Sequence, residues 1–364
     1  MEQEPHKLPL RFYEIDMLRF LAAFSVVLYH YCYVGFNMMH LSPVRYPALE
    51  PLTKYGYLGV ELFFVISGYV VLMSAYKKSI QQFFLSRVTR LYPAYWVACT
   101  LCFLVVYFFG PKPGNLAWSD IMHVSVKEWA VNMTMFQEFV GSSNLDGPYW
   151  TLTKELTFYF LISLMLAYGL FSNLDIVLTL WLVYTAVTGP TPAVHSPFFY
   201  LLMPDYSAFF IAGMLFYLLQ NKLLDRWKVY ALLALSFLLC LRSARAEAAT
   251  YASIFHQPFS MVIIALVLVA IFVVFWLIIT RTLDLQRYRW LSWLGALTYP
   301  LYLLHSNIGF VVLQRFSQVN PYVLLVCLLS LMLVAAFLLH VGVEKKLSRP
   351  LGQQLHKVFS HLSR

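Results

Sequence analysis

Ten long apolar segments run through this chain, and they constrain its fold more than any other feature. A membrane-spanning helix needs about 20 consecutive, mostly apolar residues. Segments of that kind are predicted near residues 17–37, 56–76, 91–110, 150–169, 175–189, 204–220, 229–242, 258–280, 291–313 and 321–343. Only 12% of the 364 residues are charged and 60% are hydrophobic, whereas soluble domains carry about 25% charged residues. We therefore predict an all-α polytopic membrane protein with about ten transmembrane helices in one bundle.

The distribution of basic residues predicts the orientation of the bundle. With the N-terminus inside, 18 of the 26 Lys and Arg residues fall on the inner side and 7 on the outer side. Basic residues concentrate in cytoplasmic segments, so both termini are predicted to be cytoplasmic. The net charge of +9 is then a property of the inner membrane surface, and it does not indicate nucleic-acid binding. We expect one membrane domain over residues 1–350, a short basic cytoplasmic tail at 351–364 and no separate soluble domain.

The first apolar segment contains an arginine and a histidine, Arg19 and His30. Eleven positions at about 100° each amount to roughly three helical turns, so both side chains share one face about 16 Å apart along the axis. Ionisable residues inside spans face the bundle interior or a wet cavity. The predicted topology places Arg19 at the inner mouth and puts His30, Glu155 and His305 at one level in the outer half of the membrane.

A second basic cluster precedes the third span, in "FFLSRVTRLYPAYW". Arg87 and Arg90 are three residues apart and lie near one helical face. Guanidinium groups bind phosphate oxygens in pairs, so these arginines and Arg19 are candidates for holding a phosphorylated ligand at the inner face. A long ligand of this kind, with its reactive end near His30, would have the shape of an acyl-coenzyme A.

Five motifs in order make the sequence resemble the membrane-bound acyltransferase family 3 of O-acyltransferases. They are "IDMLRFLAAFSVVLYH", "GVELFFVISGYV", "RVTRLYPAYW", "GPYWTLTKELTFY" and "LGALTYPLYLLH". Each motif alone is weak, but five in the family's order cover most of the chain. Many members carry an added periplasmic hydrolase-like domain, which is not expected in this chain.

The resemblance implies transfer of an acyl group, most often acetyl, from cytoplasmic acyl-CoA to a hydroxyl of a carbohydrate or related acceptor. It implies a ten-helix core, a catalytic His30, a functional Glu155 and cofactor-binding arginines at Arg19, Arg87 and Arg90. Acyl-CoA would be the donor substrate, no permanently bound cofactor is expected, and no metal site is predicted.

The hypothetical mechanism keeps two roles open for each catalytic residue. His30 would act as general base on the acceptor hydroxyl or carry the acyl group briefly. Glu155 would orient the imidazole, as a carboxylate does in a catalytic triad, or take the proton itself. Candidates for binding the acceptor at the outer side are Asp146, Tyr149, Trp150 and His305.

The expected partners are acyl-CoA, a carbohydrate or lipid-linked glycan acceptor and membrane lipid, with glycan-assembly proteins as an open option. The expected location is a bacterial inner membrane. The identity of the acceptor, the length of the acyl chain and the oligomeric state stay open.

Other interpretations of the same residues also stay open. Arg19, Arg87 and Arg90 would serve as interfacial anchors in any membrane protein, and Glu155 or His305 would serve as helix–helix contacts. Buried Arg, His and Glu also suit a proton-coupled secondary transporter or flippase. A third alternative is a noncatalytic member of a glycan-assembly complex.

Overall fold

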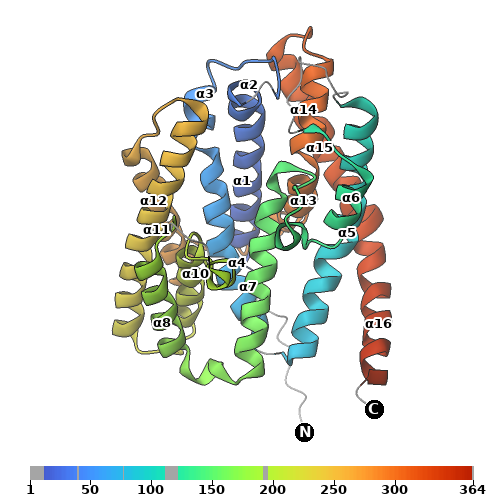
Figure 1. The fold of residues 1–364 in the computed structure, drawn as a ribbon. Coiled ribbons are helices and arrows are strands. Elements are labelled where there is room, and N and C mark those ends of the chain that lie inside the picture. Colours follow the sequence, from blue (N-terminus) through green and yellow to red (C-terminus); the bar gives the residue numbers. More distant parts are fainter. Residues whose placement is uncertain (1–11, 39–40, 77, 111–121, 192–195, 363–364) are drawn as a thin grey trace.

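The computed structural model describes residues 12–38, 41–76, 78–110, 122–191 and 196–362, and these residues form helices and no strand. Figure 1 shows α1 (Tyr13–Tyr29) in the middle of the bundle. The start of α1 and the end of α16 (Lys345–Leu362) lie at the same end of the molecule. We call this end the inner end and the opposite end, toward which α1 runs, the outer end.

Two groups of helices flank α1 in Figure 1. One group contains α4 (Gly59–Ala75), α8 (Leu174–Thr188), α10 (Ser207–Gln220), α11 (Arg226–Phe255) and α12 (Met261–Ile279). The other contains α5 (Ile80–Phe109), α13 (Leu291–Leu304), α14 (Ser306–Arg315), α15 (Pro321–Leu339) and α16. The helix α7 (Trp150–Ala167) packs against both α4 and α5. Short helices complete the described chain: α2 (Gly35–Asn37), α3 (Glu50–Thr53), α6 (Val126–Asn132) and α9 (Pro197–Leu202).

Each of the ten predicted segments corresponds to helix, and the all-α polytopic fold is confirmed. Within the described residues, eight helices are long and apolar enough to cross a membrane, or nine when α13 and α14 count as one span. The remaining predicted span is α7, an 18-residue helix that carries Lys154 and Glu155. Its polar residues keep it outside the group of eight.

Three predicted boundaries differ from the structure. α5 begins at Ile80, eleven residues before the predicted span, because Ser79 and Gln82 form a reciprocal capping box. α11 extends to Phe255, well beyond residue 242, through a polar stretch that the apolar pattern does not reveal. The predicted span at 291–313 is two helices that meet at an angle of 65°.

Two glycines allow a close contact between α4 and α10. A Cβ atom on Gly68 would lie 1.9 Å from the backbone oxygen of Phe210, and one on Gly213 would lie 1.9 Å from that of Val65. Small residues let membrane helices approach closely and gain van der Waals contact. This contact fixes α4, which forms one wall of the cavities described below.

We expect Gly68→Ala and Gly213→Ala each to destabilise the purified protein by about 1–3 kcal/mol, since an added methyl group must separate the two backbones. The midpoint of thermal unfolding in detergent would fall by several degrees. Gly342→Ala is the matched control, because no atom lies within 4 Å of the position of its Cβ. Equal midpoints for all three variants would contradict the packing argument.

Candidate active site

Two histidines from opposite ends of the chain meet in the outer half of the bundle. His30 begins a π-helical turn, His30–Val34, which follows α1, and such turns occur frequently at functional sites. His305 lies at the break between α13 and α14 and is fully buried. His305 Nε2 lies 3.2 Å from His30 Nδ1, and the two ring centroids are 4.9 Å apart.

The backbone around the two rings assigns their protons. His30 Nδ1 lies 2.8 Å from the carbonyl oxygen of Val26, and His305 Nδ1 lies 2.9 Å from that of Tyr302. A carbonyl oxygen only accepts, so each Nδ1 must carry a hydrogen, and each Nε2 of a neutral ring is then an acceptor. The Nδ1 hydrogen of His30 is therefore shared between Val26 and His305 Nε2. His30 Nε2 takes part in none of the described hydrogen bonds and keeps its lone pair.

The break that positions His305 is held by two side chains from the segment before α7. Asp146 Oδ1 accepts the backbone N–H of Asn307 at 3.0 Å. The Tyr149 hydroxyl donates to the carbonyl oxygen of Leu303 at 3.1 Å. In a continuous helix the N–H of residue 307 would bond to the carbonyl of residue 303, so these two side chains take over the partners of that missing bond.

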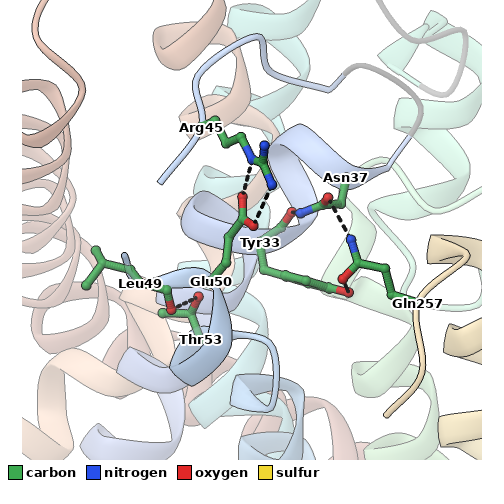
Figure 2. A network of polar contacts seen from close by, with 7 residues as sticks. All are labelled: Tyr33, Asn37, Arg45, Leu49, Glu50, Thr53 and Gln257. Carbon is green, nitrogen blue, oxygen red and sulfur yellow. Dashed lines mark hydrogen bonds and ion pairs between the residues drawn. The ribbon is translucent and has the colours of Figure 1, made fainter. Parts of the chain in front are cut away.

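The π-helical turn after His30 is anchored at its outer end by a polar network, which Figure 2 shows. The Tyr33 hydroxyl donates to Gln257 at 3.2 Å, and the Gln257 amide donates to Asn37 at 3.3 Å. Asn37 in turn donates to the Tyr33 carbonyl oxygen at 2.9 Å. The nearby pair of Arg45 and Glu50 has two bonds, at 2.9 and 3.2 Å. This network ties the turn to the connection between α11 and α12.

His30 lines an outer chamber of about 540 Å³. Aromatic rings form much of its wall, and Ser306 and Asn307 at the start of α14 also line it. The aromatic residues are Tyr29, Tyr57, Trp150, Tyr251, Phe255, Tyr302 and Phe310. Rings of this kind stack on apolar faces of sugars or other ligands while their polar tips bond to hydroxyl groups. The chamber is thus suited to a small ligand next to the free nitrogen of His30.

A smaller inner cavity of about 100 Å³ lies toward the inner end and is lined by Arg19, Arg90 and Glu155. Val60 and Tyr302 line both this cavity and the outer chamber. The two spaces therefore adjoin at a narrow point between α4 and α13. We call these two adjoining spaces, the basic one near the inner end and the histidine one nearer the outer end, the track.

Two charged side chains around the inner cavity, Arg19 and Glu155, have defined partners. Arg19 Nη1 lies 3.8 Å from Asp16 Oδ1. Glu155 accepts hydrogen bonds from Ser67, at 3.2 Å, and from Tyr159. These contacts place Glu155 beside the arginines and not beside the histidines.

Arg87 lies on α5, one helical turn closer to the inner end than Leu91. Leu91 lines the inner cavity. Arg87 donates to Ser74 at 3.1 Å, and its guanidinium lies 5.5 Å from the Tyr159 ring. Its Nη1 is buried and has no hydrogen-bond partner among the described residues. Arg87 thus keeps a free donor near the inner cavity without lining it.

The structure separates the predicted site residues into three places. Arg19, Arg90 and Glu155 line the inner cavity, while His30 and Trp150 line the outer chamber and His305 contacts His30. The sequence predicted Glu155 and the two histidines at one depth in the membrane, but Glu155 lines the inner cavity. His305, and not Glu155, lies next to the His30 ring. Asp146 and Tyr149 are fully buried and line neither cavity, because their polar atoms hold the helix break.

Tyr302 is a site residue that sequence reasoning missed. It lines both cavities, and its hydroxyl lies 2.8 Å from the Thr151 hydroxyl. It precedes His305 by three positions, so the spacing of one helical turn was a signal that could have revealed it.

Comparisons with known proteins agree with this geometry. The chain matches the family model described as an acyltransferase domain, acyltransferase family 3, over residues 12–341. It is 32% identical to nodulation protein 10 of Rhizobium leguminosarum over 163 residues, which are 42% of this chain and 43% of that protein. It is 31% identical to the peptidoglycan O-acetyltransferase OatA of Listeria monocytogenes over 158 residues, 40% of this chain and 22% of OatA.

A third relative is the acyltransferase MdmB of Streptomyces mycarofaciens, 24% identical over 157 residues, which are 42% of this chain and 39% of MdmB. The matches thus span less than half the length of these three relatives. No solved structure matches the chain. The fold and the site define a multi-pass membrane protein with a histidine centre. The family match identifies its class, and the chain belongs to acyltransferase family 3.

Loss of either side chain at the helix break is expected to slow acyl transfer. Tyr149→Phe removes a neutral hydrogen bond of about 1 kcal/mol, which corresponds to about a five-fold lower kcat. Asp146→Ala removes the acceptor of the Asn307 N–H and leaves that buried donor unpaired, which is expected to cost about 10–100-fold. Tyr95→Phe is the matched control, because Tyr95 is a neighbouring buried tyrosine that bonds to the Asn132 carbonyl oxygen.

The kinetic constants separate this positioning role from direct acceptor binding. If Tyr149 holds the break, Tyr149→Phe lowers kcat and leaves the KM for the acceptor near the wild-type value. A raised KM with an unchanged kcat would show instead that Tyr149 contacts the acceptor.

Proposed function

We propose that this protein transfers an acetyl group from cytoplasmic acetyl-CoA to a hydroxyl of a carbohydrate acceptor at the periplasmic side of a bacterial inner membrane. The observation that carries this proposal is the track formed by the two adjoining cavities. Arg19 and Arg90 line its inner part, and His30 lines its outer part. The relatives named O-acetyltransferases supply the precedent for the acyl group and for a glycan acceptor.

The donor would enter from the inner end. Its phosphates would meet Arg19, Arg90 and the free donor of Arg87, since guanidinium groups bind phosphate oxygens through charge-assisted hydrogen bonds. Glu155 is held by its bonds to Ser67 and Tyr159 and would balance the charge of the neighbouring arginines. The thioester end would extend past Val60 and Tyr302 toward His30. The concentration of basic residues at the predicted inner surface supports the cytoplasmic assignment of this end.

The reaction then follows from the proton positions in the histidine pair. His30 Nε2 takes the proton from the acceptor hydroxyl while the hydroxyl oxygen attacks the thioester carbonyl carbon. A carbon–oxygen ester bond forms, the carbon–sulfur bond breaks, and the thiolate of coenzyme A leaves. The imidazolium of His30 is stabilised by its bond to the Val26 carbonyl oxygen and returns its proton to the thiolate. His305 holds the ring in this orientation.

Donor binding is tested with radiolabelled acetyl-CoA and detergent-purified protein. We expect Arg19→Ala and Arg90→Ala each to raise the Kd for acetyl-CoA about 10–100-fold, because a charge-assisted hydrogen bond contributes about 1.5–3 kcal/mol. Arg226→Ala is the matched control, since Arg226 is an exposed basic residue at the first position of α11. A wild-type Kd in both cavity variants would make these arginines interfacial anchors and would contradict the proposal.

The histidine pair is tested by thioester turnover. His30→Ala is expected to bind acetyl-CoA with the wild-type Kd and to lose turnover about 100-fold or more, as for other general bases. His305→Ala keeps the base but releases its ring, so it should lower kcat by a smaller factor. Full turnover in His30→Ala would exclude the mechanism. Absence of thioester cleavage in the wild type would favour a transporter.

A further inference from the structure

We propose that the outer chamber selects an acceptor that carries a positively charged amine close to the hydroxyl that is acylated, and that it disfavours anionic acceptors. This inference rests on the proposed function, because it names the chemical class of the acceptor. It is supported by the charge of the residues that line the chamber and by two carboxyl groups beside the chamber wall. Aromatic rings lie between these carboxyl groups and the chamber.

The outer chamber has an acidic character that contrasts with the rest of the protein. The chain has a net charge of +9, yet no Lys or Arg is among the described residues that line this chamber. Its lining contains the carboxylate Glu128 and the histidines His30 and His123. The inner cavity, by contrast, contains two arginines. One track thus offers a basic site for an anionic donor and a site without fixed positive charge for the acceptor.

Two carboxyl groups lie directly beside the chamber wall. Glu61 follows the wall residue Tyr57 by four positions, and Glu247 precedes the wall residue Tyr251 by four. In both cases one helical turn separates the carboxyl group from the ring. Glu61 is 1% exposed, and neither of its oxygens receives a hydrogen bond from a donor of the described chain. The two carboxyl groups lie close enough to interact electrostatically.

The partly buried lysine Lys154 does not neutralise this pair. Lys154 binds Asp205 at 2.7 Å, so its charge is already balanced. Glu247 accepts one hydrogen bond from the Tyr206 hydroxyl at 3.3 Å, and a hydroxyl adds no charge. When Glu61 and Glu247 share one proton, the pair carries one negative charge. A buried charge of this kind is costly unless something compensates it, and a cation in the adjoining chamber would do so.

The wall between the carboxyl pair and the chamber is aromatic. The rings of Tyr57 and Tyr251 are 4.9 Å apart and nearly perpendicular, and the ring of Tyr29 lies 5.8 Å from that of Tyr57. An ammonium group is attracted to the negative faces of such rings. The Tyr57 hydroxyl is buried and has no partner among the described residues. Rings backed by negative charge favour a cation and repel a carboxylate.

The inference is tested by binding of three methyl glycosides to the full-length protein in detergent, measured by equilibrium dialysis without acetyl-CoA. The first is methyl glucoside, the second its 2-deoxy-2-trimethylammonio analogue, and the third methyl glucuronide. They present a neutral, a cationic and an anionic form of one sugar. The trimethylammonio group contains no N–H, so it cannot be acylated on nitrogen. Acetylation of each glycoside is then measured with acetyl-CoA.

We expect the cationic glycoside to bind at least ten-fold more tightly than the neutral one, and the anionic glycoside to bind most weakly. Glu61→Gln and Glu247→Gln should each bring the ratio of the cationic to the neutral Kd close to one. Two variants are used because a change at the more buried Glu61 can impair folding. Asp175→Asn is the control, since Asp175 binds Lys228 at the surface of α8 and should leave the ratio unchanged.

Equal or tighter binding of the glucuronide would overturn the inference, as would a wild-type ratio in both glutamine variants. Failure of the proposed function gives a different result. In that case the cationic glycoside is preferred in dialysis, but acetyl-CoA is not cleaved and no glycoside is acetylated. The charge selection and the acyl transfer are therefore judged by separate measurements.

Discussion

The contact between His30 and His305 depends on a missing backbone hydrogen bond. In a continuous helix the N–H of Asn307 would donate to the carbonyl oxygen of Leu303. The N–H of Asn307 and the carbonyl oxygen of Leu303 bond instead to Asp146 and Tyr149. Inside a membrane, unpaired backbone groups cost several kcal/mol, so a helix can break only where other groups satisfy them. One short segment before α7 supplies both partners. The position of His305 thus depends on side chains of a segment about 150 residues away in the sequence.

The same break also shapes the space that the histidines face. α14 starts at an angle of 65° to α13, so its first residues Ser306 and Asn307 line the outer chamber. A straight helix over residues 291–315 would continue along the axis of α13 and would leave no such wall. The chamber, the histidine pair and the narrow point at Tyr302 are therefore three consequences of one bend.

The sequence predicted the apolar segments and the chemical types in the site, because these depend on composition and on helical spacing. It correctly placed Arg19 and His30 on one face, since eleven residues span about three turns. It did not predict the role of Asp146 and Tyr149, because the backbone groups they bind are about 150 residues away. It also wrongly placed Glu155 with the histidines. The predicted depth of a residue in the membrane does not show which face of α7 packs against which neighbouring helix. The bend at His305 was invisible because the apolar pattern continues through it.

A neutral histidine as the orienting group has a chemical consequence that a carboxylate would not have. A carboxylate next to His30 would form a buried ion pair with the imidazolium and so hold the proton on the base. His305 Nε2 instead offers only a lone pair to the shared hydrogen of His30 Nδ1. His30 is then favoured in its neutral form before each reaction. In the proposed mechanism the proton has one nearby destination, the departing thiolate, and its return regenerates the base. Under that proposal, protonation of the coenzyme A thiolate and renewal of the His30 base would be one step.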